Sequence, residues 1–477
     1  MKRKTTSLLI ALLWSVACLP VKAQILKIDG IEYAIHEKTA SASVKDGKGA
    51  SGSVTLPSSV DYNGKSYPVT QIDEYSFFEC NGLESIIIPE NVDIIENYAF
   101  CQSAKLSKVT LPQEMSSIGE SAFSQCPLEE VTLPKGLTRI ESYCFQLNKI
   151  KSIIIPEGVV TILDGAFNHC ENLQTVSLPQ SLREIGTYAF QSCDLHEVVI
   201  PEGVTTISKA LDIDNVFDYD GYSFYNNKNL KSVHIPSTVT FIGTGSFGNC
   251  NNLTTITVAD NNPVYDSRNA CNAIIETESN TLVSGCKTTT FPQDIVCIIE
   301  DAFINITDLG NIVLPESVTI IEPYAFYNCT GLTGVDIPAS ATSIGESAFG
   351  GLADSEFIPS LTTVTVHATS PTPIDENVFS LHGWDANNNW EEYFDDAPYE
   401  QATLYVPAGT KEIYQNTGGW KKFKNIVEMT TGIEDISTQN AEGSEWYSFD
   451  GKRQKTPHKG LNIYREKGKP SRKILMN

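Results

Sequence analysis

Cysteines are the residues of this 477-residue chain with the widest chemistry, since thiols bind zinc, form disulfides and act as nucleophiles. No Cys-x-x-Cys pair occurs, so the spacing does not favour zinc. Six of the twelve cysteines instead stand three residues after a phenylalanine: Cys80, Cys126, Cys170, Cys193, Cys250 and Cys329. A fixed position in a repeated segment predicts small thiols buried in a core.

Cys271 and Cys286 lie outside this set. They flank a segment that we expect to form a hairpin turning at Glu278-Ser279, which would place the two side chains directly opposite each other. Secretion would permit oxidation, so the sequence leaves two alternatives open, a disulfide or two thiols.

The seven histidines are dispersed and form neither a metal-binding pair nor a triad spacing. His234 falls on an outward strand position, where it is a candidate ligand contact or is simply exposed to solvent. Four acids lie close together in the sequence: Asp212, Asp214, Asp218 and Asp220. Their spacing lacks the glycine and the glutamate of an EF-hand, so a solvated acidic loop is favoured over a calcium site. The sequence therefore predicts no catalytic residue, no metal and no cofactor.

The net charge of −24 argues against nucleic acid or an anionic membrane as a partner. Residues 1–23 have a basic start, a short apolar run and small residues at Val21-Lys22-Ala23, which predicts a cleaved signal peptide. The run is too short to span a bilayer comfortably, and no later segment is a transmembrane candidate. Cys18 would suit a lipoprotein, but Ser15 stands where a large aliphatic residue is usual.

A short sequence motif recurs ten times along the chain, and the elements that it forms must position these residues. It consists of an apolar residue, two variable residues, an aliphatic, one variable residue, an aliphatic and then, with one exception, proline. The copies end at Pro89, Pro112, Pro134, Pro156, Pro179, Pro201, Pro236, Ala259, Pro315 and Pro338. A phenylalanine marker follows most copies, and the undisturbed period is 22 or 23 residues. Such a period predicts a solenoid of stacked coils.

The alternating aliphatics predict one strand per coil with one buried face, and the proline ends it. The phenylalanines should stack into a continuous buried spine. The outward strand positions are small, mixed and flat, without an aromatic stripe. This disfavours a glycan groove and suits a broad protein partner, or no partner on that face at all.

Several segments depart from the repeat. We expect an N-terminal cap over 24–56, repeats over 57–380 and a projecting hairpin insert near 261–291. A cap over 381–429, a linker over 430–444 and a small β tail over 445–477 should follow. Asn63-Gly64 predicts a tight hairpin turn.

Four aromatic residues gather in a polar segment predicted to be an irregular loop: Trp384, Trp390, Tyr393 and Phe394. Exposed rings in loops are enriched at binding hot spots, so these are candidate ligand contacts. The alternative is that the rings fold back and seal the last coil.

The motif Leu-x-x-Val-x-Leu-Pro, followed by Ile-Gly-x-x-Ala-Phe-x-x-Cys, resembles the BspA-like leucine-rich repeat over about 50–427. The resemblance implies a leucine-rich-repeat right-handed superhelix, mostly β with short helical or irregular segments. It also implies a secreted or surface protein of a Gram-negative bacterium that adheres to host-surface or bacterial surface proteins without catalysis. A structural spacer is the alternative, and a glycan-binding or glycan-degrading accessory protein is less favoured.

The tail is similar to the C-terminal sorting domains of type IX secretion. The similarity lies in Trp446–Lys452 and Gly460–Tyr464, and residues 451–477 have nine basic residues and one acid. This resemblance implies that the tail directs export or anchoring.

Overall fold

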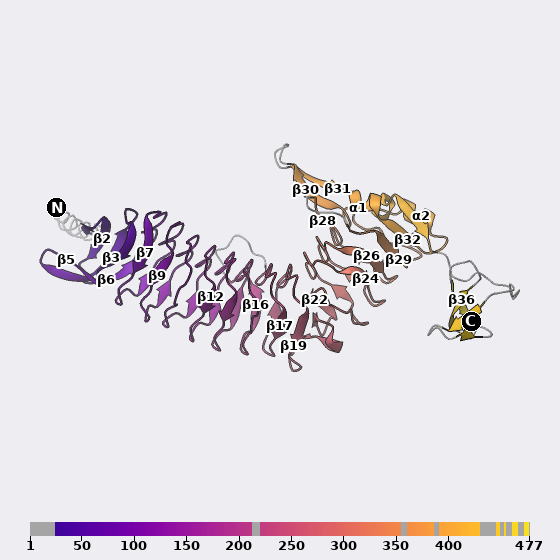
Figure 1. Ribbon diagram of the computed structural model, residues 1–477, viewed down its shortest axis with the longest axis horizontal. Coiled ribbons are helices and arrows are strands. Elements are labelled where there is room, and N and C mark those ends of the chain that lie inside the picture. Colours follow the sequence, from indigo (N-terminus) through magenta and orange to yellow (C-terminus); the bar gives the residue numbers. More distant parts are fainter. Residues whose placement is uncertain are drawn as a thin grey trace, which may run out of the picture. The chain divides into compact units, whose positions relative to one another are not determined.

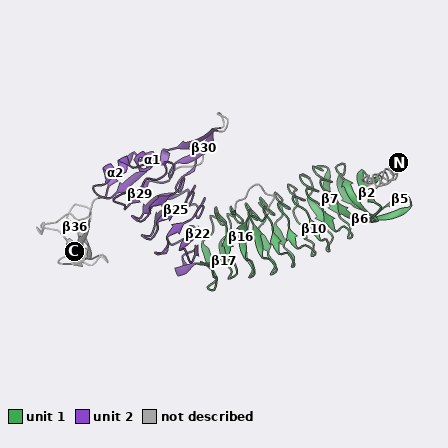
Figure 2. Cartoon of the chain, turned by 180° about the vertical axis from the view of Figure 1, so that it is seen from behind, with its two compact units in different colours: residues 1–266 green, residues 267–477 purple. Residues whose placement is uncertain are grey.

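The computed structural model describes residues 24–211, 220–353, 360–385 and 391–429, together with four strands between 445 and 476. The chain divides into two compact units, one up to Asp266 and one from Ser267 (Figure 2). Coils recur along each unit, each adding short strands beside those of the coil before it (Figure 1). The predicted signal peptide and linker lie outside the described residues.

Most copies of the recurring motif form a short strand that pairs in parallel with a neighbouring strand of the same row. Ile86 and Val109 are buried on the inner face while Ile87 is 50% exposed, as the period-two pattern predicts. This first strand row contains β4 (Gly52–Thr55), β7 (Leu83–Ile87), β9 (Lys108–Thr110), β12 (Ser152–Ile154), β14 (Thr175–Ser177), β17 (Ser232–Ile235), β19 (Thr255–Val258), β24 (Gly310–Val313), β26 (Leu332–Ile337), β29 (Thr363–Val366), β32 (Thr403–Val406) and β33 (Asn425–Glu428).

A second strand row, not predicted from the sequence, lies before the phenylalanine markers. Its strands are mostly two residues long, which is too short for alternation to show, and they also pair in parallel. The row contains β8 (Ile94–Ile95), β10 (Ser117–Ile118), β11 (Arg139–Ile140), β13 (Thr161–Ile162), β15 (Glu184–Gly186), β16 (Thr206–Lys209), β18 (Phe241–Ile242), β23 (Cys297–Ile298), β25 (Ile320–Ile321) and β27 (Ser343–Ile344).

The phenylalanine markers stack in the cores between the two rows. Successive rings are nearly parallel, with centroids 4.8 Å apart at Phe77 and Phe100 and 5.0 Å apart at Phe100 and Phe123. The prediction of buried stacked rings is confirmed. The stack forms two runs, Phe77 to Phe247 in the first unit and Phe303 to Phe379 in the second, where we expected one.

The turns that hold these rings have left-handed residues on both sides of the phenylalanine. Around Phe100, Tyr98 has φ 56° and Gln102 has φ 61°. The amides of these three residues donate to carbonyls of the next coil at 2.8 to 2.9 Å. The left-handed conformation costs about 1–2 kcal/mol per residue, and hydrogen bonds between coils offset that cost.

The first unit begins with antiparallel strands. β1 (Gln24–Ile28), β2 (Ile31–His36) and β3 (Ser41–Asp46) pair in sequence, and β3 then pairs in parallel with β6 (Lys65–Ile72). Asn63 and Gly64, at φ 50° and 75°, make the tight turn between β5 (Ser59–Tyr62) and β6.

The insert in the repeat is a hairpin of β21 (Ala273–Glu276) and β22 (Thr281–Gly285), but it does not project. β22 pairs in parallel with β23, and Ile275 and Leu282 are fully buried, so the expectation of a projecting hairpin is wrong. β20 (Tyr265–Asp266) and the 3-10 turn η1 (Arg268–Ala270) precede the hairpin.

This hairpin has the architecture of the N-terminal cap. A Cβ on Gly285 would lie 2.1 Å from Cε1 of Phe303, and one on Gly47 would lie 2.0 Å from Cε1 of Phe77. In each case a glycine without a side chain lets the first ring of a stack pack against the hairpin. The insert therefore covers the start of the second core.

The register of the insert bears on the predicted alignment of Cys271 with Cys286. A β-bulge between Ile274 and Ile275 shifts the pairing by one residue, so Cys286 lies beside Asn272, whose carbonyl accepts from its Sγ at 3.5 Å. The expected direct alignment of Cys271 with Cys286 is therefore displaced by one residue, both cysteines are buried, and the disulfide between them stays a prediction.

The end of the second unit is closed by aromatic residues packed around Phe379. Tyr399, Trp420 and Phe423 contact its ring with centroids 5.3 to 6.3 Å away, and all three are buried. They lie on or beside α1 (Ala397–Gln401) and η2 (Trp420–Lys422), and α2 (Lys411–Asn416) adds a short helix. Within the described residues, no helix is long and apolar enough to cross a membrane.

The tail contains four short strands that pair as one antiparallel sheet, in the order β35-β34-β36-β37. These strands are β34 (Glu445–Ser448), β35 (Arg453–Gln454), β36 (Gly460–Arg465) and β37 (Arg472–Met476).

Candidate binding groove

The first strand row is interrupted twice in the first unit. After β9, the ladder to the next coil is reduced to one bridge between Lys108 and Glu130, and residues 131–133 form no strand. A single bridge between Thr175 and Glu197 marks the second interruption. Residues 24–211 are described without a gap, and in this stretch no main-chain hydrogen bond joins residues 131–133 to β9 or β12.

Both interruptions coincide with a turn that is one residue short. Leu128 follows Phe123 by five residues and Leu195 follows Phe190 by five, whereas six is usual in the other coils. A third short turn precedes Ile150, and its strand β12 pairs only with the following β14.

In the coil that follows each interruption, a buried asparagine hydrogen-bonds to the main chain of the shortened turn. Asn148 replaces the cysteine of other coils; its Nδ2 donates to the carbonyls of Phe123 at 2.8 Å and Phe145 at 3.0 Å. Its Oδ1 accepts from the Leu128 amide at 3.1 Å. Asn227 makes the same three contacts after the second short turn. An asparagine at this position thus satisfies main-chain groups that the short turn leaves unpaired.

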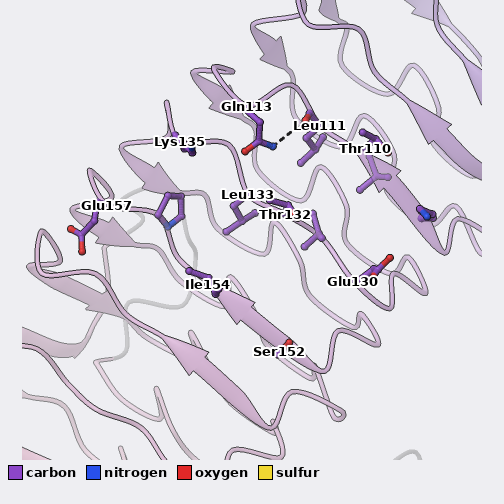
Figure 3. A pocket seen from close by; sticks show the side chains of 14 residues that line it. Thr110, Leu111, Gln113, Glu130, Thr132, Leu133, Lys135, Ser152, Ile154 and Glu157 are labelled. Carbon is purple, nitrogen blue, oxygen red and sulfur yellow. Dashed lines mark hydrogen bonds between the residues drawn. The ribbon is translucent and has the colours of Figure 1, made fainter.

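A groove with a volume of about 850 Å³ lies over the first interruption. Figure 3 shows its lining from three successive coils, where the chain through Glu130 and Thr132 runs without a strand. Lys108 and Glu130 lie toward the starts of their segments of the strand row, and Lys135 and Glu157 follow the ends. The charged lining is balanced, with two lysines and two glutamates, although the whole chain is strongly acidic.

Exposed aliphatic side chains accompany the groove on the same row. Ile154 lines it and is 73% exposed, while Ile87 and Val199 are 50% and 68% exposed. The groove shows that the outward face is not flat, contrary to the expectation from the sequence. The signal that sequence reasoning missed is the one-residue shortening before Leu128.

The predicted aromatic loop is instead a β-hairpin of β30 (Leu381–Asp385) and β31 (Glu391–Asp395). Trp384 and Tyr393 are 52% and 41% exposed, and Trp390 lies outside the described residues. The ring centroid of His382 lies 4.2 Å from that of Trp384 and 5.2 Å from that of Phe394. β30 also pairs in parallel with β28 (Gly351–Leu352).

The other candidates lie apart from the groove lining. His234 is exposed, and its Nδ1 lies 2.9 Å from Oγ1 of Thr257. Of the acid cluster, only Asp220 is described, and its carboxylate accepts from the Ala210 amide at 2.6 Å. The described residues contain no group of three or more His, Cys, Asp or Glu placed to hold a metal ion.

A row of half-exposed tyrosines, which sequence reasoning missed, lies two residues before the phenylalanines. Tyr75 and Tyr98 stack face to face with centroids 5.1 Å apart, and Tyr98 donates its hydroxyl to Glu120 at 2.6 Å. In this pair each ring covers one face of the other.

The ladder cysteines are buried thiols, as predicted. Burial raises the pKa of Cys126, Cys170 and Cys250 to about 12 from 9.0, whereas Cys297 is only half-buried.

We expect Cys297 to be alkylated first in the folded mature protein, with the ladder thiols protected until unfolding.

Only the unfolded chain ionises the ladder thiols readily between pH 9 and about 12, so the free energy of unfolding should fall as pH rises through that window. Mass spectrometry after timed alkylation, with urea melts at several pH values, measures both. Rapid labelling of Cys126 in the folded protein, or a disulfide between ladder cysteines, would contradict this packing.

Comparison with known proteins supports the same architecture. The family model described as "BspA type Leucine rich repeat region" matches in six copies that together run from residue 58 to 381. No curated protein matches the chain.

Solved structures of similar proteins come from several bacteria. A leucine rich cell surface protein from Faecalibacterium prausnitzii A2-165 is 23% identical, with a TM-score of 0.55, over 88% of this chain and 98% of that protein. A leucine-rich repeat protein from Bacteroides ovatus ATCC 8483 is 21% identical over 72% and 94%, with a TM-score of 0.40. The pneumococcal vaccine antigen PcpA is 14% identical over 85% and 99%, with a TM-score of 0.47.

The match with the F. prausnitzii protein shows a shared fold. The family model covers more than half of the chain, from residue 58 to residue 381. The chain belongs to the BspA-type leucine-rich repeat family.

Proposed function

We propose that this protein is a secreted or surface-exposed, non-catalytic binding protein whose partner is an extracellular host protein or another bacterial surface protein. The observation that carries the proposal is the groove over residues 131–133, together with the exposed Ile87 and Ile154 on the same strand row. Exposed aliphatic side chains beside a concave site are typical of protein-binding surfaces. The F. prausnitzii protein, described as a cell surface protein, supports the location.

Binding of residues 24–477 to host matrix and bacterial surface proteins tests the proposal. Partners captured from surface extracts would be identified, purified and titrated against the wild type and variants. Thr132→Arg and Ile154→Arg should each weaken binding by about tenfold or more, because both side chains are exposed on the strand row beside the groove.

The hairpin of β30 and β31 is a second candidate contact because Trp384 and Tyr393 are exposed. Trp384→Ala is therefore the matched comparison. Loss of binding in that variant alone would assign the contact to the hairpin. Full binding in every variant would reject both surfaces, and the absence of any surface partner would favour a structural spacer.

We propose that the tail directs export to the outer surface of a Gram-negative cell through type IX secretion. The support is its similarity to sorting domains and its basic composition after a polar linker. Deleting 445–477 should leave the unfolding of the repeats unchanged, because few contacts should cross the linker. The truncated chain should accumulate in the periplasm. Normal surface display of that chain, measured by protease accessibility on whole cells, would reject the sorting role.

A further inference from the structure

We propose that the groove over residues 131–133 binds an extended peptide segment of the partner, whose main chain pairs with the open edges of β9 and β12. This inference rests on the proposed binding function and names the chemistry of the ligand.

The main chain around the groove provides the first argument. Successive residues of a strand direct their amides and carbonyls to opposite neighbours. The Thr110 carbonyl accepts from Ile88 on the side of β7, so the main-chain groups of Val109 and Leu111 face the groove. The Leu111 carbonyl there accepts from Nε2 of Gln113 at 3.3 Å, which leaves its amide as the open group. By the same alternation, the Ile155 amide donates to Ser177, so the main-chain groups of Ser152 and Ile154 face the groove from the other side.

These two edges lack a complete ladder between them. Lys108 and Glu130 form the single bridge, and residues 131–133 make no main-chain hydrogen bond to either strand. Open strand edges are templates for strand addition, in which main-chain hydrogen bonds provide affinity. The interruption in the sheet therefore offers donors and acceptors on both sides of one groove.

The side chains define which peptide would fit. One lysine and one glutamate lie toward each end of the groove, Lys108 with Glu130 and Lys135 with Glu157. This balance suits a peptide without large net charge and disfavours a polyanion. Ile154, at 73% exposure, and Thr132 offer contacts to aliphatic or hydroxyl-bearing side chains. A volume of about 850 Å³ is within the range of sites that enclose a small ligand.

Linear peptides about ten residues long, selected from a displayed random library against residues 24–477, provide the probe. Each selected peptide would be synthesised with a single N-methyl group at successive residues. Strand pairing predicts that N-methylation weakens binding about tenfold or more at alternate residues and has little effect between them. Hydrogen exchange of the complex should show slowed exchange at the amides of Leu111, Ser152 and Ile154.

Two variants of the protein distinguish the contribution of the Ile154 main chain to peptide binding from that of its side chain. The Ile154 amide faces the groove, so Ile154→Pro removes a donor to the ligand without breaking a hydrogen bond within the chain. We expect Ile154→Pro to abolish peptide binding and Ile154→Ala to weaken it only severalfold. The N-methyl series needs no protein variant, so it decides the question even if Ile154→Pro fails to fold.

Two outcomes would overturn the inference. One is a peptide that competes for the groove with no alternation in the N-methyl series and no protected amide. The other is a selection that yields no peptide sensitive to Thr132→Arg or Ile154→Arg. In both cases, a protein partner that still responds to those arginine variants would leave the proposed function intact and assign a different mode of binding.

Discussion

Replacing Phe123 with alanine should lower the free energy of unfolding by about 3–5 kcal/mol. The ring is fully buried and stacks between Phe100, at 5.0 Å, and Phe145, at 5.7 Å, so its removal leaves a cavity inside the stack. Left-handed residues on both sides fix the turn that holds the ring, which limits collapse around the cavity. Urea unfolding followed by circular dichroism measures the change.

The matched control is Ser152→Ala, on an exposed strand position in the next repeat. It should shift the free energy of unfolding by no more than about 0.5 kcal/mol. An unchanged midpoint for Phe123→Ala would show that the ring is not part of a packed stack.

Asn148→Ala should cost about 2–4 kcal/mol. The substitution leaves the buried Leu128 amide and two carbonyls without the amide group that contacts them, and an orphaned buried group costs about 1–3 kcal/mol. The change should also loosen residues 128–134 and weaken peptide binding at the groove. Hydrogen exchange of the Leu128 amide, together with urea unfolding, measures both effects.

Cys170→Ala is the control for this position. Cys170 stands three residues after its phenylalanine, as Asn148 does, but only its Sγ contacts the preceding turn, at 3.1 Å from the Phe145 carbonyl. Its replacement should cost less than that of Asn148. Equal losses for the two variants would mean that the asparagine only fills space and does not support the short turn.

The candidate site was only partly predictable. The strand face was correctly identified as outward and without an aromatic stripe. The groove was not expected, because it depends on how a single missing residue before Leu128 displaces the chain from the ladder. Trp384 and Tyr393 were predicted to be exposed candidates in a loop, and the structure places them on paired strands.

Sequence alone determined the repeat, the buried phenylalanines and the burial of the ladder cysteines. Each depends on one residue type at one fixed position, and a solenoid places equivalent positions beside each other. The parallel pairing of Val109 with Ile86 follows from the same regularity.

Tertiary structure decided the features that depend on hydrogen bonds between coils. Tyr98 and Gln102 adopt left-handed conformations against their own preference, because their amides bond to the next coil. The two-residue strands exist only as partners of neighbouring coils, and the bulge at Ile274 sets a register that separates Cys271 from Cys286. The bonds between coils join residues about one period apart, so no local pattern in the sequence encodes them.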